Sequence, residues 1–200
     1  MLLNKKTLLS LFLIAALLVL ALFLYFSKNN DSFLNNFLTS EIDGLRDQNP
    51  ELALYIDDIE KFSKKLNDQE IATYADLGLA FKSLADQTGD KKHYQKALDV
   101  YEKAIELTKR KNIVFILNAG NMAVYTGDYQ TAKSYYEEAI SVAPGDIAGY
   151  QKLIELHMYQ LKSPKEDIIA VFDKGIKRMF DPDALKKWKA SYLKSLNENK

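Results

Sequence analysis

"VYTGDYQTAKSYYEEAISVAP", residues 124–144, is the stretch of sequence that decides the fold. Small and aromatic residues recur in it at steps of three or four, which is the spacing of one face of an α-helix. These residues are Tyr129, Ala132, Tyr136 and Ala139. Gly127 and Asp128 precede this pattern, and Pro144 follows it.

The same pattern occurs once more upstream. "YQKALDVYEKAIEL" (94–107) aligns with "YQTAKSYYEEAISV" (129–142), 35 residues later. The matching residues are Tyr94, Ala97, Tyr101, Ala104 and Leu107 in the first copy, and Tyr129, Ala132, Tyr136, Ala139 and Val142 in the second. A weaker third copy follows in "IIAVFDKGI", where Phe172 and Gly175 lie 36 residues beyond Tyr136 and Ala139. Self-similarity at a period of this length is the signature of a repeat protein.

Each copy is preceded by a small-residue motif, Leu77-Gly78-x-x-Phe81 before the first and Ala119-Gly120 before the second. Together these motifs resemble the tetratricopeptide repeat. The resemblance covers about residues 70–180 and implies three units of two antiparallel helices. Small residues would sit where helices approach closely, and aromatic rings would fill the holes between turns. Gly127 and Asp128 would make the turn between the two helices of the second unit, and Pro144 would stop its second helix. The third unit departs from the pattern, because Ile154 replaces the usual small residue and "QLKSPKED" is two residues longer.

Helical patterns continue on both sides of the repeats. Residues 28–69 combine a linker with two apolar stripes, one of Phe33, Leu34, Phe37, Leu38, Ile42 and Leu45, the other of Leu52, Tyr55, Ile56, Ile59, Phe62 and Leu66. Between the stripes we expect the side chain of Asn49 to cap a helix that Pro50 opens. Asp181-Pro182-Asp183 opens a last helix in residues 181–200, which would cap the array with Leu185, Trp188, Tyr192, Leu193 and Leu196 on one side. With no sustained period-2 alternation, the predicted fold is all-α: an α-solenoid behind an N-terminal transmembrane helix.

That transmembrane helix is predicted within residues 1–27. Residues 7–26 carry no charge, and about 20 helical residues span the hydrocarbon layer of a bilayer. A cleaved signal peptide is the alternative, but its apolar core is shorter, about 7–15 residues. Lys5 and Lys6 precede the span, so the N-terminus is expected in the cytoplasm and the repeats outside it, in the periplasm of a bacterium. The predicted localisation is therefore the bacterial inner membrane, as a single-pass protein with an uncleaved signal anchor.

Composition argues against several function classes. The chain holds no cysteine, which excludes disulfides and thiolate chemistry. Its formal net charge is +0, which is unfavourable for binding a nucleic-acid backbone. No phosphate-binding glycine loop or nucleophile elbow occurs, and the two histidines, His93 and His157, have no recurring acid at metal-ligand spacing. His157 is expected to pack inside the third unit. We therefore expect no enzyme activity, no cofactor, no metal and no small-molecule substrate.

The resemblance to tetratricopeptide repeats implies a protein partner, bound on the concave surface by the first helix of each unit. The predicted groove residues are Leu79, Lys82, Val114, Leu117, Asn118, Asn121, Val124, Tyr125, Gln151, Glu155, Met158 and Tyr159. Only Asn118 and Lys152 resemble the family's clamp for a C-terminal carboxylate, so a contact through apolar residues or tyrosine is expected instead. An alternative is that residues 31–66 of the same chain fill the groove.

From these features we expect a non-enzymatic, membrane-anchored scaffold or adaptor in an envelope assembly, such as secretion, cell-wall or flagellar machinery. The alternative function is a chaperone-like accessory of a translocon that binds emerging chains in the periplasm. An adaptor would have one stoichiometric partner, whereas a chaperone would bind many unfolded clients weakly.

Overall fold

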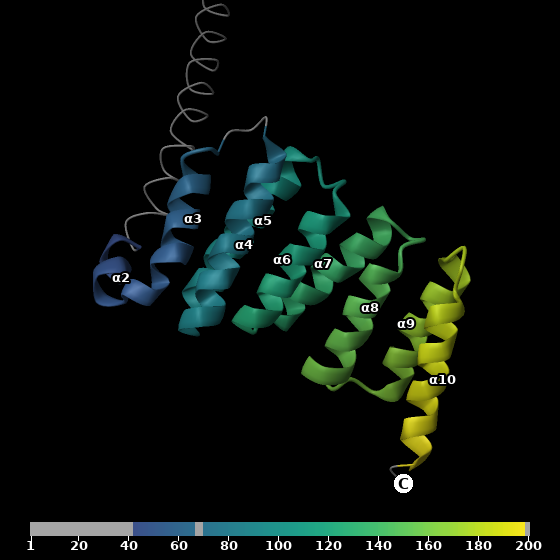
Figure 1. Cartoon of the computed structure of the whole chain (residues 1–200). Helices are drawn as coiled ribbons and strands as arrows, with labels where there is room; N and C mark the ends of the chain where they lie inside the picture. Colours follow the sequence, from purple (N-terminus) through teal and green to yellow (C-terminus); the bar gives the residue numbers. More distant parts are fainter. Residues whose placement is uncertain (1–41, 67–69, 199–200) are drawn as a thin grey trace, which may run out of the picture.

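The structure is a computed structural model that describes residues 42–66 and 70–198. Within these ranges all regular structure is helical, and consecutive helices lie side by side in chain order (Figure 1). The elements are α2 (Asp43–Gln48), η1 (Pro50–Leu52), α3 (Ala53–Ser63), α4 (Ile71–Thr88), α5 (Lys91–Leu107), α6 (Ile113–Thr126), α7 (Tyr129–Val142), α8 (Ile147–Glu155), η2 (Leu156–Gln160), α9 (Lys165–Arg178) and α10 (Asp183–Glu198).

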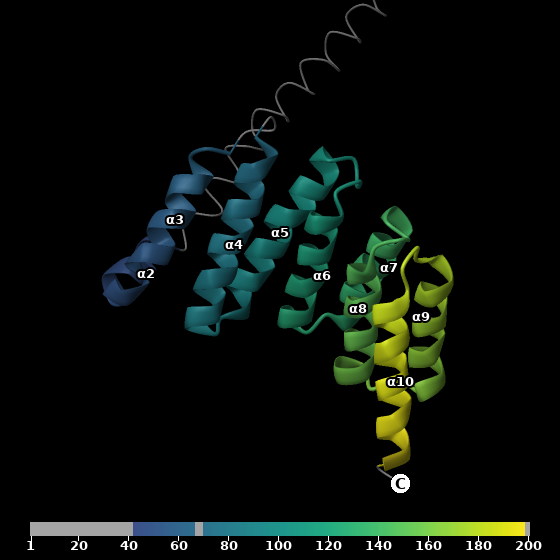
Figure 2. The ribbon, with the colours of Figure 1, turned by 45° about the vertical axis from the view of Figure 1, so that its right-hand side comes forward.

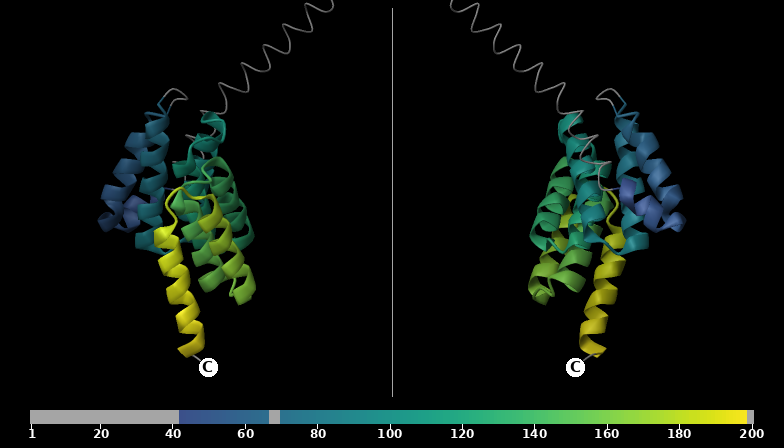
Figure 3. Two further views of the ribbon diagram at one scale, coloured as in Figure 1. Left: turned by 90° about the vertical axis from the view of Figure 1, so that its right-hand side faces the viewer. Right: turned by 90° about the vertical axis from the view of Figure 1, so that its left-hand side faces the viewer.

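The helices form three hairpins, α4 with α5, α6 with α7, and α8 with α9, and each hairpin also packs against the next. Turning the molecule keeps this order visible from α2 to α6 (Figure 2). Seen from its two sides, the C-terminal end of α10 (yellow) extends beyond the other helices (Figure 3). The α-solenoid predicted from the 35-residue period is therefore confirmed in the described part of the chain.

The turns inside the first two hairpins follow from their residues. Gly89 and Gly127 end α4 and α6 in the left-handed conformation, with φ of 69° and 96°, where a side chain would add strain. Asp90 and Asp128 then cap the next helices, and their carboxylates accept the backbone N–H of Lys92 and Thr131. The predicted turn at Gly127 and Asp128 is confirmed.

Two glycines allow the helices of a hairpin to approach closely. A Cβ atom at Gly78 would lie 2.5 Å from Cε1 of Tyr101, and one at Gly120 would lie 2.5 Å from Cε1 of Tyr136. Each tyrosine ring therefore packs directly onto the backbone of the opposite helix. This confirms the predicted roles of the small and aromatic residues in the first two units.

The buried residues form two clusters that together run along the array. One cluster contains buried residues from Ile42 to Met122, plus Ala139, and the other runs from Ala123 to Tyr192. Leu117 packs against both clusters, so the core is continuous across α6. Each hairpin is thus stabilised by its neighbours, as expected for a solenoid.

The N-terminal elements extend the array. Helix α3 packs on α4 through Ile56 and Ile59, which are fully buried, as the second apolar stripe predicts. Ile42 is buried and Leu45 partly buried, whereas Phe33, Leu34, Phe37 and Leu38 lie outside the described residues.

The expected side-chain cap at Asn49 is wrong. Asn49 lies between the end of α2 and the start of η1, and its backbone groups form hydrogen bonds with both elements. Its N–H donates to the carbonyl of Leu45, and its own carbonyl accepts from Leu52 N–H at 3.0 Å. Pro50 opens η1 as predicted.

The predicted span at residues 7–26 also lies outside the described residues. None of the helices that the structure describes is long and apolar enough to cross a membrane.

The third unit has an irregular first helix. Helix α8 continues into the π-helical segment η2, which leads to a turn where Lys162 takes a positive φ of 49°. His157 is buried here, as predicted, with its Nδ1 2.7 Å from Oγ of Ser163. Ile154 is fully buried, and close approach to α7 occurs instead at Gly149, where a Cβ would lie 2.9 Å from Cγ1 of Ile140.

The predicted capping helix is α10. Leu185 and Tyr192 are buried, and Trp188 and Leu196 are partly buried against the second cluster. The prediction is wrong for Leu193, whose side chain remains 37% exposed. It follows Tyr192 directly and therefore lies about 100° around the helix from that buried ring.

Candidate protein-binding groove

Three surface hollows follow one another along the array. The first, of about 270 Å³, lies between α3 and α4; the second, of about 340 Å³, between α4 and α6; the third, of about 180 Å³, between α6 and the α8–η2 helix. The first is lined by Leu54, Tyr55, Asp58, Phe62, Asp76, Leu79, Ala80 and Ser83. The second is lined by Ala75, Asp76, Leu79, Lys82, Tyr101, Asn118, Asn121, Met122 and Tyr125. The third is lined by Asn121, Val124, Tyr125, Tyr136, Lys152, Glu155, Leu156, Tyr159 and Gln160.

Neighbouring hollows share their walls. Asp76 and Leu79, one turn apart on α4, line both the first and the second hollow. Asn121 and Tyr125, one turn apart on α6, line both the second and the third. The three hollows therefore form a single track across α3, α4, α6 and η2, which we call the groove.

Exposed apolar side chains concentrate in the groove. Of the eight large hydrophobic residues that are exposed in the described part of the chain, four line it: Leu54 at 69%, Leu79 at 56%, Tyr125 at 44% and Tyr159 at 62%. Apolar residues gathered in a hollow that is rimmed by polar groups are typical of an interaction site.

Tyr125 is held in place at the centre of the groove. Its ring centroid lies 4.9 Å from that of Tyr94, and Nζ of Lys82 lies 5.6 Å from the Tyr125 centroid. Lys82 and the Tyr94 hydroxyl both donate hydrogen bonds to Asp86, at 2.6 and 2.7 Å. The bond to Asp86 raises the pKa of Tyr94 to about 12, so this hydroxyl keeps its proton at neutral pH. These contacts hold Tyr125 in one orientation, which would lower the entropic cost of binding a partner here.

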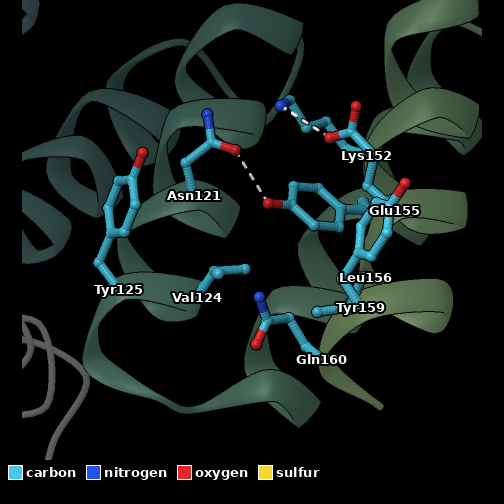
Figure 4. Close-up of a pocket in the computed structure, with 9 residues that line it drawn as sticks. Asn121, Val124, Tyr125, Lys152, Glu155, Leu156, Tyr159 and Gln160 are labelled. Carbon is cyan, nitrogen blue, oxygen red and sulfur yellow. Dashed lines mark hydrogen bonds and ion pairs between the residues drawn. The ribbon is translucent and has the colours of Figure 1, made fainter. Parts of the chain in front are cut away.

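In the third hollow the Tyr136 hydroxyl donates a 2.9 Å hydrogen bond to Oδ1 of Asn121 (Figure 4). Burial raises the pKa of Tyr136, so the ring remains a neutral donor. Because the amide oxygen is engaged, Nδ2 of Asn121 is left to donate to a carbonyl group of a partner. Lys152 and Glu155 form an ion pair across one wall, at 3.1 Å.

The charges of the groove largely neutralise one another. Lys82 pairs with Asp86, and Lys152 pairs with Glu155. Among the charged residues that line the groove, only Asp76 forms no ion pair with another described residue. Contacts with a partner would therefore rest mainly on apolar side chains, tyrosines and amides.

The structure brings eight of the predicted groove residues together. These are Leu79, Lys82, Asn118, Asn121, Val124, Tyr125, Glu155 and Tyr159. The other four do not line the groove: Val114 and Gln151 are exposed elsewhere on the helices, and Leu117 and Met158 are partly buried against the core. The binding role of all twelve stays a prediction.

Several residues that line the groove were not predicted from the sequence. Asp76 lies one turn before Leu79 on α4, so helical spacing alone could have identified it. Leu156 and Gln160 belong to the π-helical segment, which has no clear signal in the sequence. Tyr136 was expected to be purely structural, yet its hydroxyl reaches the third hollow.

Residues 31–66 were the alternative occupant of the groove, and the structure describes residues 42–66 of this segment. Residues of α3 form a wall of the first hollow, and none of residues 42–66 lines the second or the third. Residues 31–41 lie outside the described residues.

A comparison with protein-family models identifies a tetratricopeptide repeat at residues 115–146. The match covers most of α6 and all of α7, and thus the helices that carry Asn121, Tyr125 and Tyr136. Repeats of this family are typically protein-interaction modules without catalytic activity. Within the described residues, no group of three or more His, Asp or Glu side chains is placed to hold a metal ion.

Proposed function

We propose that this chain is a non-enzymatic, membrane-anchored adaptor that binds a partner protein in the groove. The observation that carries the proposal is the continuity of the three hollows, which align half of the exposed large hydrophobic residues of the described chain across α3 and the three hairpins. The tetratricopeptide repeat at residues 115–146 contributes α6, the central helix of this track, and Tyr136 of α7. The groove offers apolar contacts and amide donors to such a partner.

The membrane anchor is residues 7–26. This uncharged stretch is long enough to span a bilayer, and Lys5 and Lys6 keep the N-terminus in the cytoplasm. The repeats then stand in the periplasm, close to the membrane in which the chain is anchored. Anchoring raises the effective concentration of the groove for partners in the same membrane. This arrangement suits a scaffold of an envelope assembly.

The ordered centre of the groove favours an adaptor over a chaperone. Tyr125 is fixed by Tyr94 and Lys82, and the Asn121 amide is oriented by Tyr136. A binding surface with fixed aromatic and amide groups selects one geometry of ligand, whereas promiscuous binders rely on flexible surfaces that can repack. A chaperone-like role remains the competing outcome of the test below.

The test is photo-crosslinking in the native cell, with a photoreactive phenylalanine in place of Tyr125 and adducts identified by mass spectrometry. The matched control carries the same group at Ser134, an exposed position of α7 that lines none of the hollows. One dominant adduct at position 125 that is missing at 134 is the expected result. A mixture of unrelated secreted proteins would instead identify a chaperone. A crosslink only to residues 31–66 of the same chain, or equal adducts at both positions, would refute the adaptor.

A further inference from the structure

The half of the groove between α3 and α6 has an unbalanced charge. Asp76 is exposed, lines both hollows of this half and has no ion-pair partner among the described residues. Asp58 lines the first hollow and lies 3.7 Å from Lys61, near the limit of an ion pair. The one basic group here, Lys82, is already bound to Asp86 at 2.6 Å. A ligand in this half therefore meets a carboxylate that no cation of the described chain neutralises.

Apolar anchoring points stand on both sides of that carboxylate. Leu54 lies on one wall of the first hollow, Leu79 on the ridge between the hollows, and Tyr125 on the far wall of the second. Helices α3 and α4 pack together, and packed helices stand about 8–10 Å apart, so Leu54 and Leu79 are roughly two turns of a ligand helix apart, at about 5.4 Å per turn. Tyr125 follows on the other side of the second hollow. An amphipathic helix repeats its apolar residues at this interval, about every seven residues.

We propose that this half of the groove receives an amphipathic helix of the partner protein, with lysine or arginine beside its apolar stripe. The stripe fills the two hollows against Leu54, Leu79 and Tyr125, and the basic side chain pairs with Asp76. An acidic side chain at that place would meet a like charge, so the carboxylate selects against acidic helices. The inference rests on the proposed function, since it specifies the partner for the same groove.

A synthetic peptide pair provides the probe. One peptide of about 18 residues, or about 27 Å as a helix, carries leucines at intervals of three and four and lysines beside them. Its matched control has glutamate in place of every lysine. Binding of each labelled peptide is measured by fluorescence anisotropy to the full chain in nanodiscs of zwitterionic lipid. Empty nanodiscs give the blank, because the basic peptide also contacts lipid.

Two variants of the chain decide the outcome. Asp76→Lys is expected to weaken binding of the basic peptide by up to about fivefold, the upper range for one exposed ion pair, and to strengthen binding of the acidic one. Glu106→Lys makes the same change of charge on α5, at an exposed position that lines none of the hollows. It is expected to leave both affinities unchanged, and circular dichroism confirms that both variants are folded.

Equal affinity of the unmodified chain for the two peptides would overturn the inference, as would equal effects of the two substitutions. Such a result leaves the adaptor proposal intact if photo-crosslinking at position 125 still gives one dominant partner. The absence of a dominant adduct would refute the adaptor proposal itself. The two failures are therefore distinguishable.

Discussion

Replacing Gly120 by alanine tests whether close helix approach holds the second hairpin together. The new Cβ would lie 2.5 Å from Cε1 and 2.9 Å from Cδ1 of Tyr136, whereas ordinary contact begins at 3.4 Å. The ring cannot retreat freely, because Tyr136 is buried and its hydroxyl is bound to Asn121. Overpacking of this kind costs about 1–3 kcal/mol.

The same substitution has an opposing effect, since alanine favours the helix over glycine by about 0.8–1 kcal/mol. The expected net loss is about 1 kcal/mol in the free energy of unfolding, or about 2–4 °C in melting temperature for a chain of this size. The control is Gly44→Ala in α2, where no atom lies within 4 Å of the new Cβ. Here the helix preference acts alone, and the stability should rise by up to about 1 kcal/mol.

The assay is thermal unfolding of the full chain in detergent, followed by circular dichroism. A Gly120→Ala variant at least as stable as the unmodified protein would refute the argument. A double-mutant cycle refines the test: in a Tyr136→Leu background the ring is gone, so the alanine should cost less. An equal cost in both backgrounds would show that the ring is not the cause.

Three further changes report on the capping, titration and packing seen in the structure. Asp128→Ala should lower the stability by about 1 kcal/mol at neutral pH. The hydrogen bond from the Thr131 side chain holds the pKa of Asp128 below its usual value. Urea titrations should therefore show the difference in stability between the variant and the unmodified protein shrinking below about pH 4. Burial lowers the pKa of His157, so the imidazole of the unfolded chain takes up a proton at a higher pH than that of the folded chain. The stability should therefore fall as the pH drops from about 7 to 5 and level off below the folded pKa. The urea midpoints of His157→Gln should lack this fall with pH. Leu185→Ala removes a fully buried side chain and should lower the free energy of unfolding by about 2–5 kcal/mol. It should also shift the fluorescence emission of Trp188, the only tryptophan of the chain, to the red. An unchanged emission and an unchanged urea midpoint would contradict the packing of α10.

The sequence predicts the repeats well because their packing depends on residues close in the chain. The tyrosines at 101 and 136 face glycines of the preceding helix in the same hairpin, so the spacing that marks the unit also marks the contact. The turn at Gly127 follows from local backbone preference in the same way. Such local rules cover the hairpins and most of the core.

The sequence predicts the groove less well, because its lining depends on how the first helices of neighbouring hairpins are placed. Val114 and Gln151 continue the helical register of true lining residues, yet they lie away from the hollows. The π-helical segment after Glu155 changes the register of its helix and brings Leu156 and Gln160 to the third hollow. Nothing in the periodicity of the apolar residues signals that change.

The shared walls of the groove have a consequence for how its specificity can change. Asp76 with Leu79, and Asn121 with Tyr125, each belong to two hollows at once. A substitution at one of them alters two neighbouring recognition positions together, so the partner must compensate at two places along its own chain. Leu54 and Tyr159 each line a single hollow, so a substitution at either of them alters one recognition position only. Divergence between related chains should therefore begin at the two ends of the groove and reach its middle last.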